Sequence, residues 1–203
     1  NRGIVLSSDI SGDINGPASP STALGSFVDS LTLNLGDEPT TADQDSNINV
    51  AGGSFSGNGT SSIGFSVLED EDVSALSFFD VFFDLATPHS FSLTGELNSF
   101  VDGGQGLAVF SLTGASNVVF QALNSGPVDL ASSGTLAAGS YHLVVSSLMD
   151  RGPTFESGSF MGGNSSFRFA LNLQEQGGPG VPEPGTLALL VMGLAIAGIR
   201  KRT

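Results

Sequence analysis

Apolar side chains recur at every second position in several short segments of this 203-residue chain. Between residues 167 and 173 every odd position is Phe or Leu, whereas the even positions are Arg, Ala and Asn. The same alternation occurs in residues 27–35, 63–67, 91–93 and 141–145. Because successive side chains of a β-strand point to opposite faces, this pattern predicts half-buried antiparallel strands.

Turn-forming residues separate these segments at short intervals. They are Gly52-Gly53, Gly57-Asn58-Gly59, Thr87-Pro88, Asp102-Gly103-Gly104, Ser125-Gly126-Pro127, Ala138-Gly139 and Gly162-Gly163. About ten short strands with such punctuation are typical of a two-sheet sandwich. The sequence therefore predicts an all-β domain over residues 1–173, an antiparallel β-sandwich of the jelly-roll type. Residues 37–49 are polar and are expected to form a long loop, and residues 130–138 are ambiguous.

Three stretches are apolar at both parities, residues 76–85, 107–112 and 118–123. Such stretches suit strands in the middle of a two-layer packing. Within the first, Phe78 and Phe82 share their parity with Asp80 and Asp84, which is awkward for a dry core. We expect core packing for these rings in preference to a sugar-binding face, with one face of the strand at a subunit interface.

The residues after 173 change in character. A Gly/Pro-rich linker covers residues 174–184, an uncharged hydrophobic segment covers 185–199, and a basic tail covers 200–203. As a helix the hydrophobic segment would be about 22 Å long, shorter than the ~30 Å hydrocarbon core of a bilayer. It would span only if the basic residues snorkel and the bilayer thins. The alternative is a buried terminal helix of a soluble domain.

This end of the chain resembles the PEP-CTERM sorting signal of Gram-negative bacteria. The resemblance rests on Val181, Pro182, Glu183 and Pro184, on the hydrophobic segment, and on the closing Arg200, Lys201 and Arg202. It implies recognition by an exosortase-type sorting enzyme, with cleavage near Pro-Glu-Pro. It also implies membrane contact through the C-terminal helix before processing. The expected location is the cell surface or extracellular matrix, with transient or permanent membrane anchoring.

Two further resemblances lie within the predicted sandwich. Residues 27–31, Phe-Val-Asp-Ser-Leu, resemble the start of the FxDxF type of PEP-CTERM proteins, although Leu31 replaces the second aromatic residue. Residues 136–145 are similar to the L-x-x-G-x-Y-x-L-x-V strand of secreted bacterial β-sandwiches. Both resemblances imply a fold and say little about chemistry.

The composition limits the classes of partner and site. The net charge is −14, which repels nucleic acid and anionic lipid headgroups and favours solubility or divalent cations. The chain has no Cys, which excludes disulfides and thiolate metal sites. It begins at Asn1, which we interpret as a mature N-terminus after removal of a signal peptide.

Catalytic signatures are weak. The two histidines, His89 and His142, stand alone in the sequence, and no Gly-x-Ser-x-Gly nucleophile elbow occurs. A Ser–His–Asp set assembled in space is not excluded by sequence order. We expect no enzymatic activity.

Calcium is the stronger chemical hypothesis. Residues 43–47, Asp-Gln-Asp-Ser-Asn, begin like an EF-hand loop, but Ile48 stands where that loop needs Gly and Ser54 where it needs Glu. A looser calcium site is expected from carboxylates, and the alternative is a solvated acidic turn. The candidate ligands are Asp37, Asp43, Asp45, Glu69, Asp70, Glu71 and Asp72.

These features predict a non-catalytic structural or adhesion protein of the cell surface or extracellular matrix. One alternative is a self-assembling filament or sheath subunit. Another is a calcium-assisted carbohydrate-binding module. The expected partners are the sorting enzyme together with exopolysaccharide or copies of the chain itself.

Overall fold

The computed structural model describes residues 1–8, 14–15, 21–35, 38–65, 73–102, 105–151 and 161–176, which form strands and their connections. The strands are β1 (Arg2–Ser8), β2 (Ile14–Asn15), β3 (Gly25–Leu35), β4 (Glu38–Asn49), β5 (Ser54–Phe65), β6 (Val73–Leu85), β7 (His89–Asp102), β8 (Gln105–Thr113), β9 (Val118–Leu123), β10 (Val128–Leu136), β11 (Gly139–Arg151) and β12 (Met161–Glu175). The predicted all-β class is therefore confirmed. The predicted C-terminal helix, 185–199, lies outside the described residues.

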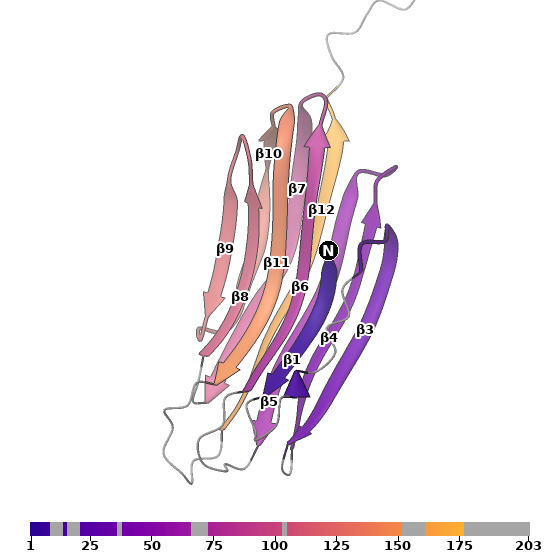
Figure 1. Cartoon of the computed structure of the whole chain (residues 1–203). Coiled ribbons are helices and arrows are strands. Elements are labelled where there is room, and N and C mark those ends of the chain that lie inside the picture. Colours follow the sequence, from indigo (N-terminus) through magenta and orange to yellow (C-terminus); the bar gives the residue numbers. More distant parts are fainter. Residues whose placement is uncertain are drawn as a thin grey trace, which may run out of the picture.

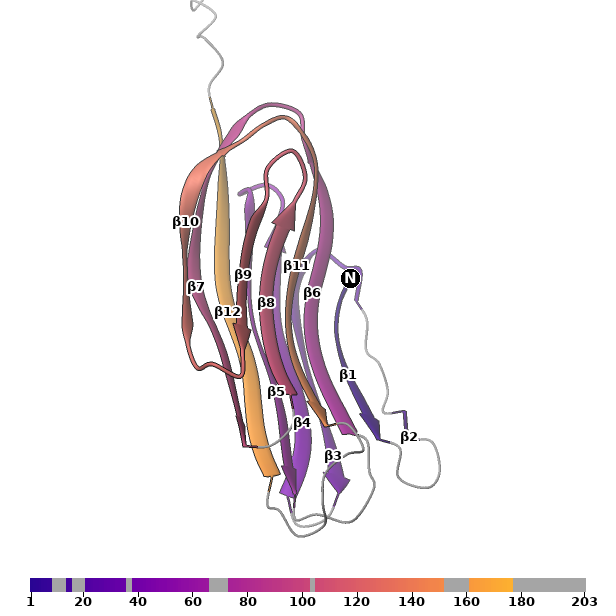
Figure 2. The same cartoon turned by 90° about the vertical axis from the view of Figure 1, so that its left-hand side faces the viewer.

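The strands form two six-stranded antiparallel sheets that pack face to face (Figures 1 and 2). Sheet A has the order β2-β1-β6-β11-β8-β9, and sheet B has the order β10-β7-β12-β5-β4-β3. From β5 to β12 the chain crosses between the sheets at every connection except the β8–β9 hairpin. These eight strands have the order of a jelly roll, β6-β11-β8-β9 over β10-β7-β12-β5. The predicted sandwich and its jelly-roll type are confirmed.

The alternating segments pack their apolar side chains between the sheets, as the sequence predicts. Tyr141, Leu143 and Val145 are buried, and so are the four Phe and Leu side chains at odd positions from 167 to 173. Within the L-x-x-G-x-Y segment, the Tyr141 hydroxyl donates a hydrogen bond of 2.9 Å to the Ala137 carbonyl oxygen. This contact anchors the connection between β10 in sheet B and β11 in sheet A.

The buried apolar side chains form a larger cluster and a smaller one beside β1 and β4, and a layer of small residues crosses the interior. Facing residues in neighbouring strands make up the layer: Ala42, Ser61, Ser165 and Ser99 in sheet B, and Ser77, Ser147, Ala108 and Ala122 in sheet A. The serines of this layer are buried. Ser165 donates a hydrogen bond across the sandwich to the Leu107 carbonyl oxygen at 2.9 Å.

Arg2 of β1 makes hydrogen bonds that link the two sheets. Its side chain is fully buried, and its guanidinium donates to the carbonyl oxygens of Ala23, Gly25 and Ser46. The guanidinium also lies 5.3 Å from the centroid of the Phe27 ring. Desolvation on burial lowers the pKa of Arg2 below its ordinary value. One cation thus ties β1 of sheet A to β3 and β4 of sheet B.

The loop predicted over residues 37–49 is wrong, because residues 38–49 form strand β4 between β3 and β5. Its inward side chains are mostly small or polar: Thr40, Ala42, Gln44, Ser46 and Ile48 are all buried. A hydropathy pattern does not reveal such a strand, since its buried face is polar. The ambiguous residues 130–138 lie mainly in strand β10.

Two of the predicted turns are also wrong. Gly57-Asn58-Gly59 lies inside β5, and Gly162-Gly163 lies inside β12. A Cβ atom on Gly59 would lie 2.5 Å from the Phe167 ring, and one on Gly163 would lie 2.6 Å from the Met149 methyl group. These glycines are needed for close packing within strands.

The stretches that are apolar at both parities are only partly central strands. β6 and β8 have neighbours on both sides, but β9 is the edge strand of sheet A. In β6 the prediction of core packing holds for Phe79, which is fully buried, and for Phe83, which packs against the core. For Phe78 and Phe82 the prediction of core packing is wrong, because these rings point outward with Asp80 and Asp84, and the Phe82 side chain is 75% exposed.

Candidate functional site

The two sheets present outer faces of different chemistry. The outer face of sheet B, here called the polar face, carries hydroxyl and amide side chains on most outward positions of β7, β12, β5, β4 and β3. They include Ser92, Thr94, Asn98, Asn164, Ser166, Asn172, Ser54, Ser56, Asn58, Thr60, Ser62, Thr41, Asn47, Ser26, Ser30 and Thr32. Every such group can donate or accept hydrogen bonds, so the face suits a hydroxylated ligand better than an apolar one.

Asp43 lies near the middle of β4 on this face. Its carboxylate accepts a hydrogen bond from the Thr60 hydroxyl of β5 at 3.1 Å and another from the Ser30 hydroxyl of β3. The carboxylate is therefore held by both neighbouring strands. Asp45 follows two residues later on the same face and is exposed.

The other predicted calcium ligands lie outside the described residues, namely Asp37, Glu69, Asp70, Glu71 and Asp72. Among the residues that the structure describes, no three His, Asp or Glu side chains come close enough together to hold a metal ion. Asp43 and Asp45 thus remain two candidate oxygen ligands on a strand, and the calcium site stays a prediction.

The outer face of sheet A, here called the apolar face, consists of the outward side chains of β1, β6, β11, β8 and β9. Its first row is entirely aliphatic and crosses all five strands: Val5, Leu76, Leu148, Leu107 and Leu123. The next two rows contain Phe78, Ser146, Val109 and Gln121, then Asp80, Val144, Ser111 and Val119. Val119 is 60% exposed and Leu123 is 51% exposed.

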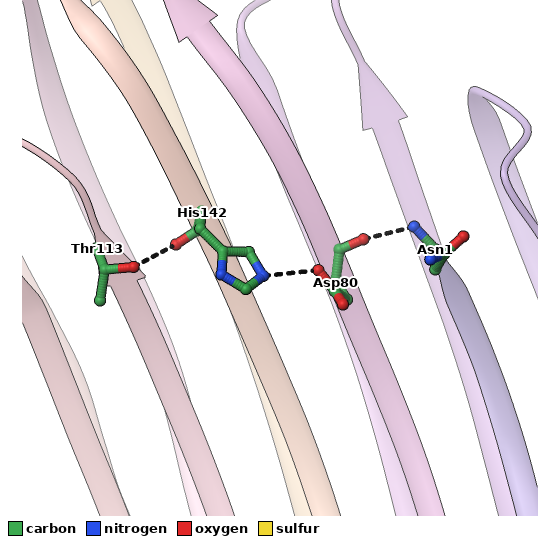
Figure 3. Close-up of polar contacts among 4 residues, drawn as sticks. All are labelled: Asn1, Asp80, Thr113 and His142. Atoms are coloured by element: carbon green, nitrogen blue, oxygen red, sulfur yellow. Dashed lines mark hydrogen bonds and ion pairs between the residues drawn. The ribbon is translucent and has the colours of Figure 1, made fainter.

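At one end of this face the structure pairs His142 of β11 with Asp80 of β6, which are 62 residues apart in sequence (Figure 3). The imidazole Nε2 lies 2.8 Å from a carboxylate oxygen of Asp80. The Phe82 ring stacks on the imidazole, with a centroid distance of 3.9 Å and an interplanar angle of 9°. Sequence reasoning treated His142 as isolated, since pairing between distant strands leaves no local signal.

The hydroxyl group of the residue that pairs with His142 in the neighbouring strand does not complete a catalytic triad with His142 and Asp80. Thr113 lies opposite His142 in β8, and its hydroxyl donates to the main-chain oxygen of His142 at 3.4 Å rather than to the imidazole (Figure 3). The other histidine, His89, opens β7, and its Nδ1 lies 2.8 Å from the Thr87 carbonyl oxygen. The structure therefore contains a His–Asp pair, but in these contacts no hydroxyl group is placed to act as a nucleophile activated by the histidine.

An apolar pocket of about 260 Å³ opens between the sheets where β6 turns into β7. Both sheets line it, with Ile48 and Phe55 from sheet B and Val81, Phe83 and Leu85 from sheet A. Its volume is below the range usual for small-molecule sites.

The predicted sorting residues lie outside the described residues: Val181, Pro182, Glu183, Pro184, Arg200, Lys201 and Arg202. In the part of the chain that the structure describes, no helix has the length and hydrophobicity needed to span a bilayer. β12 continues to Glu175, and the N–H of Gln176 donates to the Pro88 carbonyl oxygen at 3.0 Å. The chain thus leaves the sandwich beside the β6–β7 turn.

Residues 180–202 match the family model of the PEP-CTERM protein-sorting motif. A comparison with curated proteins found no match. The FxDxF subtype stays a prediction. The motif indicates an exported protein that is targeted to an exosortase and transiently associated with a membrane through this segment. The chain is therefore a protein with a PEP-CTERM sorting motif, carried by residues 180–202.

Proposed function

We propose that this protein is a non-catalytic structural or adhesion protein of the cell surface or extracellular matrix, and that its polar face contacts exopolysaccharide. The observation that carries the proposal is the dense cover of hydroxyl and amide groups over five adjacent strands of sheet B. Polysaccharide hydroxyls both donate and accept hydrogen bonds, so they match Ser, Thr and Asn side chains. Export through the sorting motif would bring this face to the polymer.

The charge of the chain favours a neutral polymer. Twenty acidic and six basic residues leave a net charge of −14, which repels an anionic polysaccharide unless cations bridge the two. Many weak hydrogen bonds across a broad face would give adhesion that depends on the number of contacts, as in multivalent binding.

The test is co-sedimentation of the full chain with extracellular polysaccharide purified from the producing cells. The variant N58A/T60A/S166A removes neighbouring hydrogen-bonding groups from β5 and β12, and it should bind at least about tenfold more weakly. The matched control S111A/S146A removes outward hydroxyls from sheet A and should bind like the wild type. Equal binding by both variants would refute the role of the polar face.

A second candidate function is carbohydrate binding assisted by a bound calcium ion. Asp43 and Asp45 offer carboxylates on the polar face itself, so a bound cation there would lie beside the proposed polymer contact. The measurement is a thermal melt with calcium and with a chelator. A calcium-dependent rise in the Tm supports the cation, and identical curves remove it from the proposal.

A further inference from the structure

We infer that Phe100 and Asn164 form a binding subsite for one uncharged sugar unit on the polar face. This subsite rests on the proposed function, because it would be one specific contact of the polar face with its polymer. It differs from the rest of that face in requiring a single aromatic ring and in accepting a short ligand, so the two proposals can be tested separately.

A hollow of about 400 Å³ lies on the polar face where β5 ends and β12 begins. Its volume is within the ~300–1,000 Å³ usual for ligand sites, unlike that of the apolar pocket between the sheets. Phe100, Asn164 and Ser62 line it together with Gly64 and Gly162. None of the side chains that line the hollow is charged, which favours an uncharged ligand.

The register of three strands places the side chains of this hollow in one row. Asn164 of β12 lies directly opposite Phe100 of β7 on one side and Ser62 of β5 on the other. In the adjacent row of the same face, Gly162 lies opposite Gly64. Neither glycine has a side chain that would fill the hollow, so space is left beside the row for a ligand.

Phe100 is unusual for its position. Among the residues that the structure describes, it is the one aromatic residue at an outward position of sheet B. Its side chain is 62% exposed. β10 pairs with β7 only from His89 to Leu97, so no described strand lies beside Phe100 on that side. Covering this ring with an apolar surface is favourable, because apolar area then leaves water.

The groups around the ring favour a sugar over an apolar partner. A pyranose ring has a face of C–H groups and a rim of hydroxyls, so it can cover the Phe100 ring while its hydroxyls bind the Asn164 amide and the Ser62 hydroxyl. The Asn164 amide is exposed and forms no hydrogen bond with the described part of the protein, so its donors and its acceptor are available. An apolar partner would leave these polar groups without hydrogen-bond partners, which is costly.

Saturation-transfer NMR on the full chain tests the subsite, with short uncharged oligosaccharides of glucose, galactose and mannose as the probes. Irradiation of the aromatic protons should transfer saturation to the ring C–H protons of at least one probe. Phe100→Ala should weaken binding of that probe at least about tenfold. Phe82→Ala is the matched control, because Phe82 is 75% exposed on the outer face of sheet A, and it should bind like the wild type.

A second pair of variants tests the amide. Asn164→Ala should weaken binding of the same probe at least about threefold. Asn172→Ala should not, because Asn172 is an exposed amide of the same face farther along β12. Retained melting curves would show that all four variants fold.

Equal binding by Phe100→Ala and Phe82→Ala would overturn the subsite, as would wild-type protein that binds none of the probes. The proposed function has a separate measurement, co-sedimentation of the polymer with the variant N58A/T60A/S166A. If that variant loses the polymer while Phe100→Ala binds the probes normally, the polar face keeps its proposed function and only the subsite is wrong.

Discussion

The hydroxyl of Ser61 in sheet B donates a hydrogen bond of 2.9 Å to the main-chain oxygen of Ser147 in sheet A. The two side-chain oxygens lie 3.1 Å apart, and both residues are fully buried. This pair joins the sheets at the layer of small residues. The two sheets are therefore connected there by hydrogen bonds as well as by hydrophobic packing.

Ser61→Ala should destabilise the fold. The substitution leaves the Ser147 oxygens without this buried donor, which costs about 1–2 kcal/mol. Ser56→Ala is the control, because Ser56 lies on the outer side of the same strand. Urea unfolding of the two variants measures the difference, and equal midpoints would contradict the role of the cross-sheet hydrogen bond.

Arg2→Met should lower the free energy of unfolding more than Ser61→Ala does. The variant keeps an unbranched apolar side chain but removes the donors to the carbonyl oxygens of Ala23, Gly25 and Ser46. Leaving such acceptors unsatisfied should lower the free energy of unfolding by about 2–4 kcal/mol. Arg168→Met, at an exposed arginine of β12, should change it little. If both variants melt alike, Arg2 does not hold β1 in place.

Gly59→Ala tests the close packing inside β5. The new methyl group would lie 2.2 Å from the Ser77 hydroxyl and 2.5 Å from the Phe167 ring. Overpacking of this kind should cost about 1–3 kcal/mol. Asn58→Ala, on the outer side of the adjacent position, provides the comparison by chemical denaturation. If Gly59→Ala were more stable than the wild type, close packing at Gly59 would not be required for the fold.

Substitutions in the sorting motif should impair processing of the chain. Substituting Pro182 and Pro184 by Ala removes the two rigid residues that flank Glu183 in the matched segment. In cells with an exosortase, the variant should accumulate as a longer, membrane-associated form, which mass spectrometry of the membrane fraction detects. Gly178→Ala, outside the match, is the control. Normal processing of the double proline variant would contradict the function of these residues.

Sequence patterns predicted the strands with an apolar stretch on the buried face, such as β11 and β12, because every second residue of 141–145 and 167–173 is Phe, Leu, Tyr or Val. They failed for β4, whose buried face carries Thr40, Gln44 and Ser46. They also misplaced glycines of β5 and β12 as turns, because glycine that makes room for a neighbour looks the same in sequence as glycine that turns the chain.

The candidate surfaces could be predicted from the sequence only in part. Core packing was expected for Phe78 and Phe82, and the two aspartates of the same parity were awkward for a dry core; the structure places all four side chains on the outer face of β6. The Asp80–His142 pair and the five-strand aliphatic row depend on register between strands far apart in sequence, which a local pattern does not encode.

By itself, the sequence determined the β class, the two-sheet architecture and the sorting motif, because these depend on local periodicity and on contiguous residues. The tertiary structure alone decided which outer face is polar and which is apolar, and which buried serines and arginine join the sheets. The reason is physical: strand order and register bring together residues tens of positions apart, and hydrogen bonds between them form only after the chain has crossed from one sheet to the other.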